Sequence, residues 1–286
     1  MTGGLSEAGP HGTDEAPVIL SELTDDGVLL LTLNRPERHN AWTLDMELLY
    51  NELFDRAESD PDVRAVVLTG AGRGFCPGMD MSVLDAASSG AKPYPTDRLP
   101  PRTRPLDCPK PVVAAVNGAC AGIGFNQALM CDVRFAVPKA KFAAAFSRRG
   151  LVAEDGVAWI LPRVVGYGHA SDLLLSSRPV TGTEAVDMGL VNRLVEPADL
   201  LATALEYAGE LARQCSPYAM SLIKRQLRDD QARGFPEGNR DARALLVEAR
   251  KAPDYREGVR SFIERRPPRF SGLGDAERSG GGKEAG

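Results

Sequence analysis

The sequence has few of the features that mark membrane, nucleic-acid-binding or secreted proteins. Its longest apolar runs, at residues 28–33, 65–68 and 112–116, fall far short of the roughly 20 residues that a membrane-spanning helix needs. Its 34 Lys and Arg residues are outnumbered by 39 Asp and Glu residues, giving a net charge of -5 and a pI of about 5.4, so a basic surface for nucleic acid is missing. Residues 1–17 have neither the basic start nor the apolar stretch of a secretory signal. We therefore expect a soluble, cytoplasmic protein with no nucleic-acid partner and no membrane span.

Cysteine and histidine are also scarce. The five cysteines are an odd number, contain no Cys-x-x-Cys pair and have no histidine at the spacing of a metal ligand. We therefore predict neither a structural zinc site nor a set of disulfides, and buried thiols in a reducing compartment are the simpler interpretation. None of the three histidines has an obvious serine or cysteine partner, which argues against a hydrolytic triad.

The 286 residues are enough for one large domain or two small ones, at about 150 residues per domain. Apolar runs typical of buried parallel strands alternate with segments of helical periodicity, and this alternation predicts an α/β fold with right-handed crossovers. The expected strands are residues 28–34, 63–69, 111–116 and 133–137, and the expected helices among them are residues 44–57 and 125–130.

The last third of the chain has a different pattern. Beyond residue 178 helical periodicity dominates, at residues 183–188, 200–214, 217–228 and 243–251. The final residues are rich in glycine and charge, a composition that cannot bury a core. We therefore divide the chain into a disordered lead-in (1–17), an α/β core (18–200), a C-terminal helical region (201–274) and a disordered tail (275–286).

Two glycine-rich segments follow expected strands, at residues 70–78 and 117–124. Glycine lets a backbone approach a ligand closely, and the first N–H groups of a helix that begins there have no intrahelical partner. Neither segment fits a nucleotide-binding fingerprint, because GxxxxGK is absent and the glycines of the first are wrongly spaced for GxGxxG. Each segment taken alone could equally be a tight turn. A proline-dense stretch at residues 93–109 is a third irregular segment of a length that is usually functional or mobile.

Three motifs stand in a fixed order along the chain. They are Leu33-Asn-Arg-Pro-Glu-Arg-His-Asn-Ala41, Gly74-Phe-Cys-Pro-Gly-Met-Asp80 and Val116-Asn-Gly-Ala-Cys-Ala-Gly-Ile-Gly124, the last followed by Met130-Cys-Asp132. With these motifs the chain resembles the crotonase family of enoyl-CoA hydratases and isomerases over roughly residues 18–271. The resemblance implies a crotonase-like spiral of ββα units with a C-terminal helical trimerisation region. It also implies a homotrimer or hexamer, and an acyl-CoA thioester as substrate with no separate cofactor.

The resemblance further implies an oxyanion hole, in which two backbone N–H groups bind the thioester oxygen and stabilise an enolate. By position its donors would be the amides of Met79 and Ile123, and we expect the adjacent Gly78 and Gly122 to contact substrate. The family usually has glycine where this chain has Ile123. An amide N–H is nevertheless present in every residue except proline, so the donor itself is kept.

The acid and base positions depart from the family's hydratases. Where those have two glutamates, one to activate water and one to supply a proton, this chain has Asn126 and Phe146. An amide does not exchange protons near neutral pH and a phenyl ring has none to exchange, so the two-glutamate mechanism does not transfer. Asn126 could hydrogen-bond a water or a substrate carbonyl, or be a satisfied buried amide. Trp159 could line an acyl pocket or pack in the core, and we count Asn126, Phe146 and Trp159 as substrate-binding candidates.

One carboxylate matches another branch of the family. Gly150-Leu-Val-Ala-Glu-Asp-Gly156 resembles the stretch of Δ3,Δ2-enoyl-CoA isomerases in which a single glutamate moves a proton between C2 and C4, and Glu154 falls on that glutamate. Asp155 lies about where a dienoyl-CoA isomerase branch has an aspartate. Alternatively both acids could cap the helix that follows them. Consecutive helical residues diverge by about 100°, so we do not expect both to reach one carbon.

The sequence therefore predicts an acyl-CoA isomerase with Glu154 as its base. Isomerisation needs only one group that removes a proton and returns it at the far end of a dienolate. A hydratase that uses Glu154 and Asp155 together is the first alternative. A non-catalytic acyl-CoA-binding protein that has lost its acids is the second.

Overall fold

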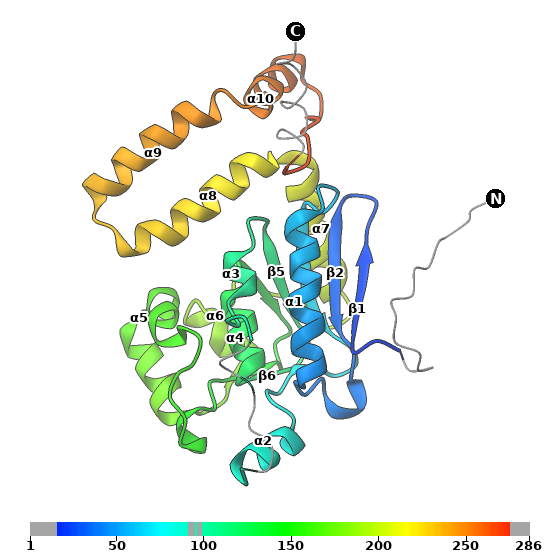
Figure 1. Ribbon diagram of the computed structural model, residues 1–286, viewed down its shortest axis with the longest axis vertical. Coiled ribbons are helices and arrows are strands. Elements are labelled where there is room, and N and C mark those ends of the chain that lie inside the picture. The colour runs from blue at the N-terminus through cyan, green and yellow to red at the C-terminus, as the bar shows by residue number, and fades with distance from the viewer. Residues whose placement is uncertain (1–15, 91–94, 96–98, 275–286) are drawn as a thin grey trace, which may run out of the picture.

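The computed structural model describes residues 16–90, 95 and 99–274. Residues 1–15 of the expected lead-in (1–17) and the expected tail at residues 275–286 lie outside the described residues, as do residues 93, 94 and 96–98 of the proline-dense stretch. The described chain forms two β-sheets with helices packed around them and a run of helices at its C-terminal end (Figure 1). The predicted α/β class is therefore confirmed.

The larger sheet has six strands and forms the centre of the hydrophobic core. Its order is β1 (Ile19–Leu23), β2 (Val28–Leu33), β3 (Ala65–Gly70), β5 (Val112–Val116), β7 (Val133–Ala136) and β10 (Arg193–Leu194). β1 is antiparallel to β2, and the other neighbouring pairs are parallel. Every residue of β3 and β5 is buried, as in parallel strands covered on both faces. The four predicted strands are therefore confirmed to within two residues at each end.

The smaller sheet joins four very short strands, in the order β4 (Gly74–Cys76), β6 (Ala119–Ala121), β8 (Lys141–Ala143) and β9 (Val180–Thr181). Strands of two or three residues are too short to show a hydrophobic period, so they were not predicted. β4, β6 and β8 run parallel to one another. Their carboxyl ends therefore lie along one edge of the smaller sheet.

Each of these three strands belongs to a repeated ββα unit. The chain leaves the larger sheet, adds a short strand to the smaller sheet and then enters a helix, which is α2 (Met81–Ser88), α4 (Ile123–Met130) or α5 (Val157–Ser176). We call β3-β4-α2 the first unit, β5-β6-α4 the second and β7-β8-α5 the third. In each unit the loop between the short strand and the helix starts at the same edge of the smaller sheet.

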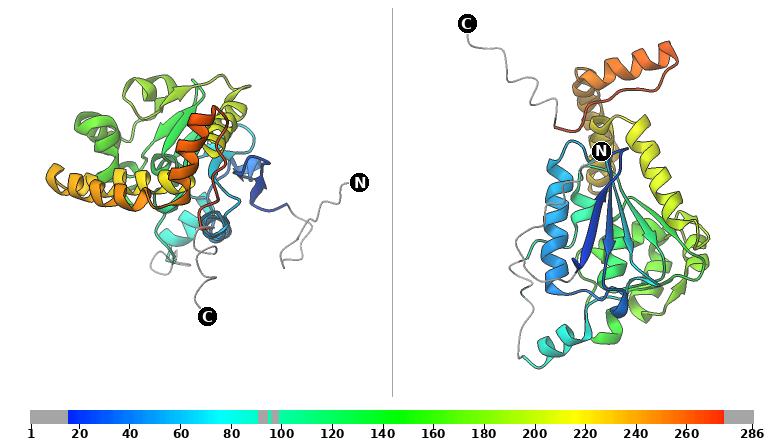
Figure 2. Two further views of the ribbon diagram at one scale, coloured as in Figure 1. Left: turned by 90° about the horizontal axis from the view of Figure 1, so that it is seen from above. Right: turned by 90° about the vertical axis from the view of Figure 1, so that its right-hand side faces the viewer.

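Two helices cover the larger sheet from opposite faces (Figure 2). α1 (Leu44–Ser59) begins at Thr43, whose side-chain oxygen accepts a hydrogen bond from the Met46 amide at 3.3 Å. α7 (Leu200–Gln214) contacts β2, β3 and β5 and buries Ala204, Ala208 and Ala212, whose four-residue spacing places them on one face. Both helices were predicted, α7 with its observed bounds. The remaining short helices are α3 (Arg104–Asp107) and α6 (Gly182–Asp187).

The last three helices extend away from the sheets (Figure 1). They are α8 (Pro217–Asp229), α9 (Phe235–Ala249) and α10 (Pro253–Glu264). α9 begins well before the predicted residue 243 and α10 was not predicted, because both run through polar sequence with few apolar residues. The proline in the first turn of each helix was a start signal that the prediction did not use. Large apolar side chains stand exposed on these helices, among them Leu227, Phe235, Phe262 and Ile263.

None of the helices in the described part of the chain is long and apolar enough to cross a membrane. All five cysteines are free thiols, and four of them are buried. Burial raises the pKa of the Cys76 and Cys131 thiols to about 12. Both therefore stay protonated and unreactive at neutral pH.

Helix α4 lies directly against β4, and Gly124 permits this close approach. A Cβ on Gly124 would lie 2.1 Å from the Cys76 carbonyl oxygen and 2.7 Å from Cys76 Cβ. We expect Gly124→Ala to lower the free energy of unfolding by about 3 kcal/mol, the upper end of the usual cost of overpacking, measured by chemical denaturation. Gly168→Ala in α5 is the matched control, because nothing lies within 4 Å of its added Cβ. Equal losses in the two variants would contradict this explanation.

Candidate active site

Two glycine backbones touch at the edge of the smaller sheet. β4 and β6 are paired with Cys76 opposite Cys120, and Gly78 and Gly122 each follow two residues later. A Cβ on Gly122 would lie 3.6 Å from the Gly78 Cα. Both glycines have positive φ, 105° and 51° respectively, a conformation that other residues rarely adopt. The contact brings the loops of the first and second units together, so that Met79 and Ile123 follow side by side in register.

The Met79 amide points away from Trp42, the residue that pairs with its loop. Trp42 donates its N–H to the Gly78 carbonyl at 2.8 Å and accepts from the Asp80 amide at 2.9 Å. Successive amides of an extended chain point to opposite sides, so the Met79 N–H faces the side opposite Trp42. Within the described part of the chain, this amide donates no hydrogen bond to another residue.

The Ile123 amide is the first of helix α4. The first N–H groups of a helix have no intrahelical acceptor, and the preceding Gly122 has no side chain to cap them. The positive end of the helix dipole adds to the attraction for negative charge. Met79 and Ile123 thus present two backbone donors of the kind that an oxyanion hole needs, on adjacent loops.

Glu154 and Asp155 lie in the loop of the third unit and do not cap the helix after them. Helix α5 begins at Val157, its N-cap residue is Gly156, and no side chain caps it. The capping alternative is therefore not supported. Their side chains lie instead near one guanidinium, with Arg102 Nη1 3.7 Å from Glu154 Oε2 and 3.9 Å from Asp155 Oδ2.

The expected divergence of Glu154 and Asp155 by a helical step was wrong. Both residues precede the helix, and Asp155 has a left-handed backbone with φ of 50°. This turn, followed by another positive φ at Gly156, replaces the helical geometry on which the expectation rested. The two carboxylates therefore lie close enough to face the same cation.

Asn126 connects the second unit to the third. Its Nδ2 donates a hydrogen bond to Asp155 Oδ2 at 3.1 Å. The residue is fully buried, and its Oδ1 has no hydrogen-bond partner among the described residues. The expectation of a satisfied buried amide is therefore wrong for this oxygen, which remains able to accept a hydrogen bond.

Arg102 and Glu47 form a buried ion pair behind the two carboxylates, and the sequence did not predict it. Arg102 Nε donates to Glu47 Oε2 at 2.7 Å, and Trp42 Nε1 donates to the same oxygen at 2.7 Å. Glu47 and Arg102 are only 1% and 8% exposed. One signal for it was the position of Glu47 next to Met46 and near Tyr50 on α1. These residues are buried, and a buried charge without a partner would be costly.

The pKa of Glu154 is raised above the usual value for a glutamate. Burial is the largest cause, the nearby Arg102 guanidinium opposes it, and the Asp155 carboxylate adds to it. The Glu154 side chain is still 37% exposed. It is therefore accessible and more basic than an exposed glutamate, which suits a group that removes a proton from carbon.

The two aromatic candidates differ in their surroundings. Phe146 is 6% exposed and packs with the hydrophobic core. Trp159 was expected to pack in the core as its simpler role, and this is wrong, because its side chain is exposed and the Arg163 guanidinium lies 3.9 Å from its ring centroid.

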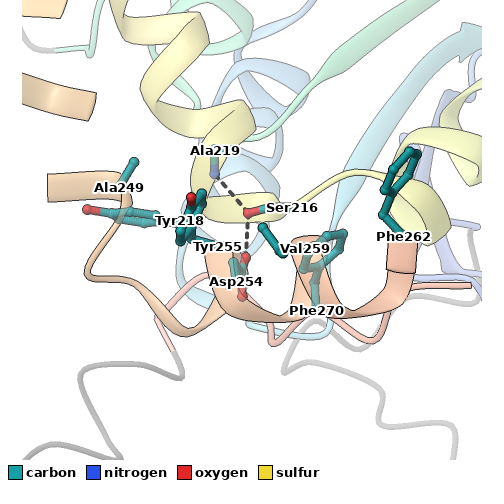
Figure 3. Close-up of a pocket in the computed structure, with 10 residues that line it drawn as sticks. Ser216, Tyr218, Ala219, Ala249, Asp254, Tyr255, Val259, Phe262 and Phe270 are labelled. Atoms are coloured by element: carbon teal, nitrogen blue, oxygen red, sulfur yellow. Dashed lines mark hydrogen bonds between the residues drawn. The ribbon is translucent and has the colours of Figure 1, made fainter. Parts of the chain in front are cut away.

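An apolar cavity of about 480 Å³ lies elsewhere, among the C-terminal helices (Figure 3). Tyr218, Val259, Phe262 and Phe270 line it, and Ser216 at its edge donates a partly buried hydrogen bond to Asp254. It contains none of the candidate residues, so we place the active site at the edge of the smaller sheet. The described residues contain no group of His, Cys, Asp and Glu side chains arranged to hold a metal ion.

The chain is similar in sequence to known proteins. A sequence model described as enoyl-CoA hydratase/isomerase matches residues 24–273. The chain is 37% identical to the 1,2-epoxyphenylacetyl-CoA isomerase of Escherichia coli (strain K12), over 89% of this chain and 98% of that protein. It is 32% identical to the enoyl-CoA hydratase EchA19 of Mycobacterium tuberculosis (strain ATCC 25618 / H37Rv), over 85% of this chain and 92% of that protein.

A solved structure shows the same fold. The crystal structure of an enoyl-CoA hydratase from Polaromonas sp. JS666 superposes with a TM-score of 0.79 at 32% identity, over 88% of this chain and 99% of that chain. Relatives named as isomerases and as hydratases both occur. The comparisons therefore favour an enzyme over the non-catalytic alternative and leave two reactions to be distinguished.

Proposed function

The chain belongs to the enoyl-CoA hydratase/isomerase family and is an enzyme with the crotonase fold, and we propose that it moves the double bond of an enoyl-CoA thioester with Glu154 as its single base. The observation that carries the proposal is that the two glutamates of the hydratases are absent, while one glutamate lies in the loop of the third unit. By the resemblance, Asn126 and Phe146 fall where the hydratases have their two glutamates, whereas Glu154 is an accessible carboxylate with a raised pKa.

In the proposed mechanism, the Met79 and Ile123 amides bind the thioester oxygen. This acidifies C2, and the Glu154 carboxylate removes a proton from it to give a dienolate whose negative charge the two amides stabilise. The same proton returns from Glu154 to C4, which shifts the double bond from C3–C4 to C2–C3. Glu154 ends ionised, as it began, so the scheme uses the acyl-CoA as substrate and no separate cofactor.

A relative supports this assignment. The 37% identical Escherichia coli protein is named an isomerase that acts on an acyl-CoA. We include Gly78, Gly122, Asn126, Phe146 and Trp159 in the proposed substrate site. The two glycines precede the Met79 and Ile123 amides, Asn126 donates a hydrogen bond to Asp155, and Phe146 and Trp159 belong to the third unit, which carries the carboxylates.

Hydration of a 2-enoyl-CoA is the second candidate, and a specific observation favours it. Asp155 and Glu154 face the same guanidinium, and the buried Asn126 Oδ1 has no donor among the described residues. A water molecule bonded to Asn126 and one carboxylate would be placed to attack C3. Relatives named enoyl-CoA hydratase support this reading.

One experiment separates the two reactions. The purified protein is incubated in heavy water with 3-enoyl-CoA and 2-enoyl-CoA of several chain lengths, and deuterium and products are followed by NMR and mass spectrometry. We expect double-bond migration, with deuterium at C2 or C4 wherever the proton on Glu154 exchanges with solvent. Rapid formation of 3-hydroxyacyl-CoA with little double-bond migration would show that the enzyme catalyses hydration rather than isomerisation.

We also propose that the enzyme works as a homotrimer or hexamer in the cytoplasm. The exposed apolar side chains of α8, α9 and α10, together with the apolar cavity between α8 and α10, support burial of these helices against other copies. The free, buried cysteines support a reducing compartment.

A further inference from the structure

Buried groups hold both the backbone and the side chain of Arg102 in place. Its carbonyl oxygen accepts a hydrogen bond from Gln127 Nε2 at 3.0 Å, and its Nε donates to Glu47 Oε2 at 2.7 Å. Gln127 is fixed in turn, because its Oε1 accepts a hydrogen bond from the Tyr50 hydroxyl at 2.6 Å. Glu47 and Tyr50 lie three residues apart on one face of α1. The position of the guanidinium is therefore set by α1 and α4.

The outer end of the guanidinium faces the two carboxylates of the third unit. The distances of 3.7 Å to Glu154 and 3.9 Å to Asp155 are too long for good hydrogen bonds. They are short enough for charge attraction, which the burial of the Arg102 side chain strengthens. Arg102 thus lies among three carboxylates, with Glu47 behind it and Glu154 and Asp155 in front. The Glu154 carboxylate is attracted to Arg102 but makes no short hydrogen bond to it, so its oxygens can still accept a proton.

Asn126 fixes where the carboxylate pair lies. It holds Asp155 by the hydrogen bond of 3.1 Å and stands three residues after Ile123, on the same face of α4. The pair therefore lies over the first turn of the helix whose leading amide we assign to the oxyanion hole. A base in this place is close to the carbon next to a bound thioester carbonyl.

We propose that Arg102, held by Glu47, is a positioning residue that keeps the Glu154 carboxylate over the first turn of α4 as an anion ready to remove a proton. This inference rests on the proposed role of Glu154 as base and adds what holds that base in place. Within the described part of the chain, the charged groups that act on Glu154 are Arg102 and Asp155. Glu47 acts through Arg102.

The arrangement predicts opposite effects from the two partners of the buried pair. Arg102→Gln removes the positive charge nearest Glu154, so the pKa of Glu154 rises and the acid limb of the pH–rate profile moves to higher pH. Glu47→Gln removes a negative charge behind the guanidinium, so the acid limb moves to lower pH. Arg102→Lys keeps the charge and is expected to keep the acid limb closer to that of the wild type than Arg102→Gln does.

The test combines kinetics with a readout that needs no turnover. The full chain is labelled with ¹³C at the glutamate carboxyls, and the Glu154 signal is assigned by its loss in Glu154→Gln. Its titration is then compared in wild type, Arg102→Gln, Glu47→Gln and Arg102→Lys. Arg104→Gln is the matched control, because Arg104 pairs with Asp55 and Glu58 and is not among the charged groups that act on Glu154, so it should leave the titration unchanged.

Titration midpoints that move in opposite directions for Arg102→Gln and Glu47→Gln would support the proposal. Unchanged midpoints accompanied by lower kcat would overturn it and leave Arg102 a merely structural role. The double variant Glu47→Gln/Arg102→Gln removes both charges of the buried pair together. It serves if a single variant does not fold, and its midpoint should lie above that of the wild type. Because the NMR titration is independent of turnover, a wild type inactive on enoyl-CoA would reject the proposed function and still leave this test decisive.

Discussion

Replacing Glu154 with glutamine is expected to lower kcat for double-bond migration about a thousandfold. In the proposed reaction Glu154 is both the base that removes the proton from C2 and the acid that returns it to C4. Positioned acid–base groups contribute about 10²–10⁴ in rate, and no other group of the cluster takes over both steps in this scheme. Glutamine has the shape of glutamate but cannot accept the proton. Steady-state kinetics with 3-enoyl-CoA measures the loss, and binding of the substrate should persist.

Asp155→Asn separates the two proposed reactions within the same cluster. Under isomerisation it should retain most of the activity, whereas a hydratase that uses both carboxylates should lose most of it.

The Glu154 side chain is partly exposed, so the thermal midpoint of Glu154→Gln should stay close to that of the wild type. As the pH is lowered, the wild-type rate should begin to fall at a pH above the pKa of an exposed glutamate. The reason is that burial raises the pKa of Glu154. A Glu154→Gln enzyme with undiminished activity would reject the assignment.

Deleting the Ile123 amide is expected to lower kcat by about 10²–10³, the usual cost of losing one oxyanion-hole donor. A backbone N–H cannot be removed by changing a side chain, except by substitution with proline. Ile123 is the first residue of α4, a position where proline is well tolerated because its N–H has no intrahelical acceptor. The preceding Gly122 has no Cβ to clash with the proline ring. Ile123→Pro therefore tests the donor itself.

Ile123→Ala is the control for the loss of the side chain. The Ile123 side chain is 5% exposed, so both variants lose packing and stability by a similar amount. Only the proline variant loses the N–H. Thermal denaturation shows whether each variant is folded at the assay temperature. Equal kcat values for Ile123→Pro and Ile123→Ala would show that this amide does not stabilise the enolate.

The larger sheet could be predicted because its strands are buried on both faces. β3 and β5 therefore appear as continuous apolar runs. The smaller sheet could not, since three residues such as Gly74–Cys76 carry no measurable period. The edge strand β1 was missed for a related reason, because it buries Ile19 while the three residues after it are exposed.

The candidate site divides in the same way. Met79, Ile123 and Glu154 lie in contiguous motifs, so a resemblance in sequence was enough to select them. Arg102 and Glu47 are 55 residues apart, and their pairing depends on how α1 packs beside the start of α3. No local pattern contains that distance. The direction of Asp155 also depended on a positive φ at a residue that is not glycine, which composition does not reveal.

The three ββα units place different chemical tasks on different loops of one sheet edge. The first and second units supply Met79 and Ile123, whose backbone amides are independent of side-chain identity. The third supplies Glu154 and Asp155 from residues 144–156, which can vary without altering either amide. Under the proposed mechanism, activation of the thioester and choice of reaction are therefore encoded in separate segments. A chain built in this way can change the fate of its enolate by substitutions in a single loop, and that loop is the natural target for redesigning this enzyme toward other acyl-CoA reactions.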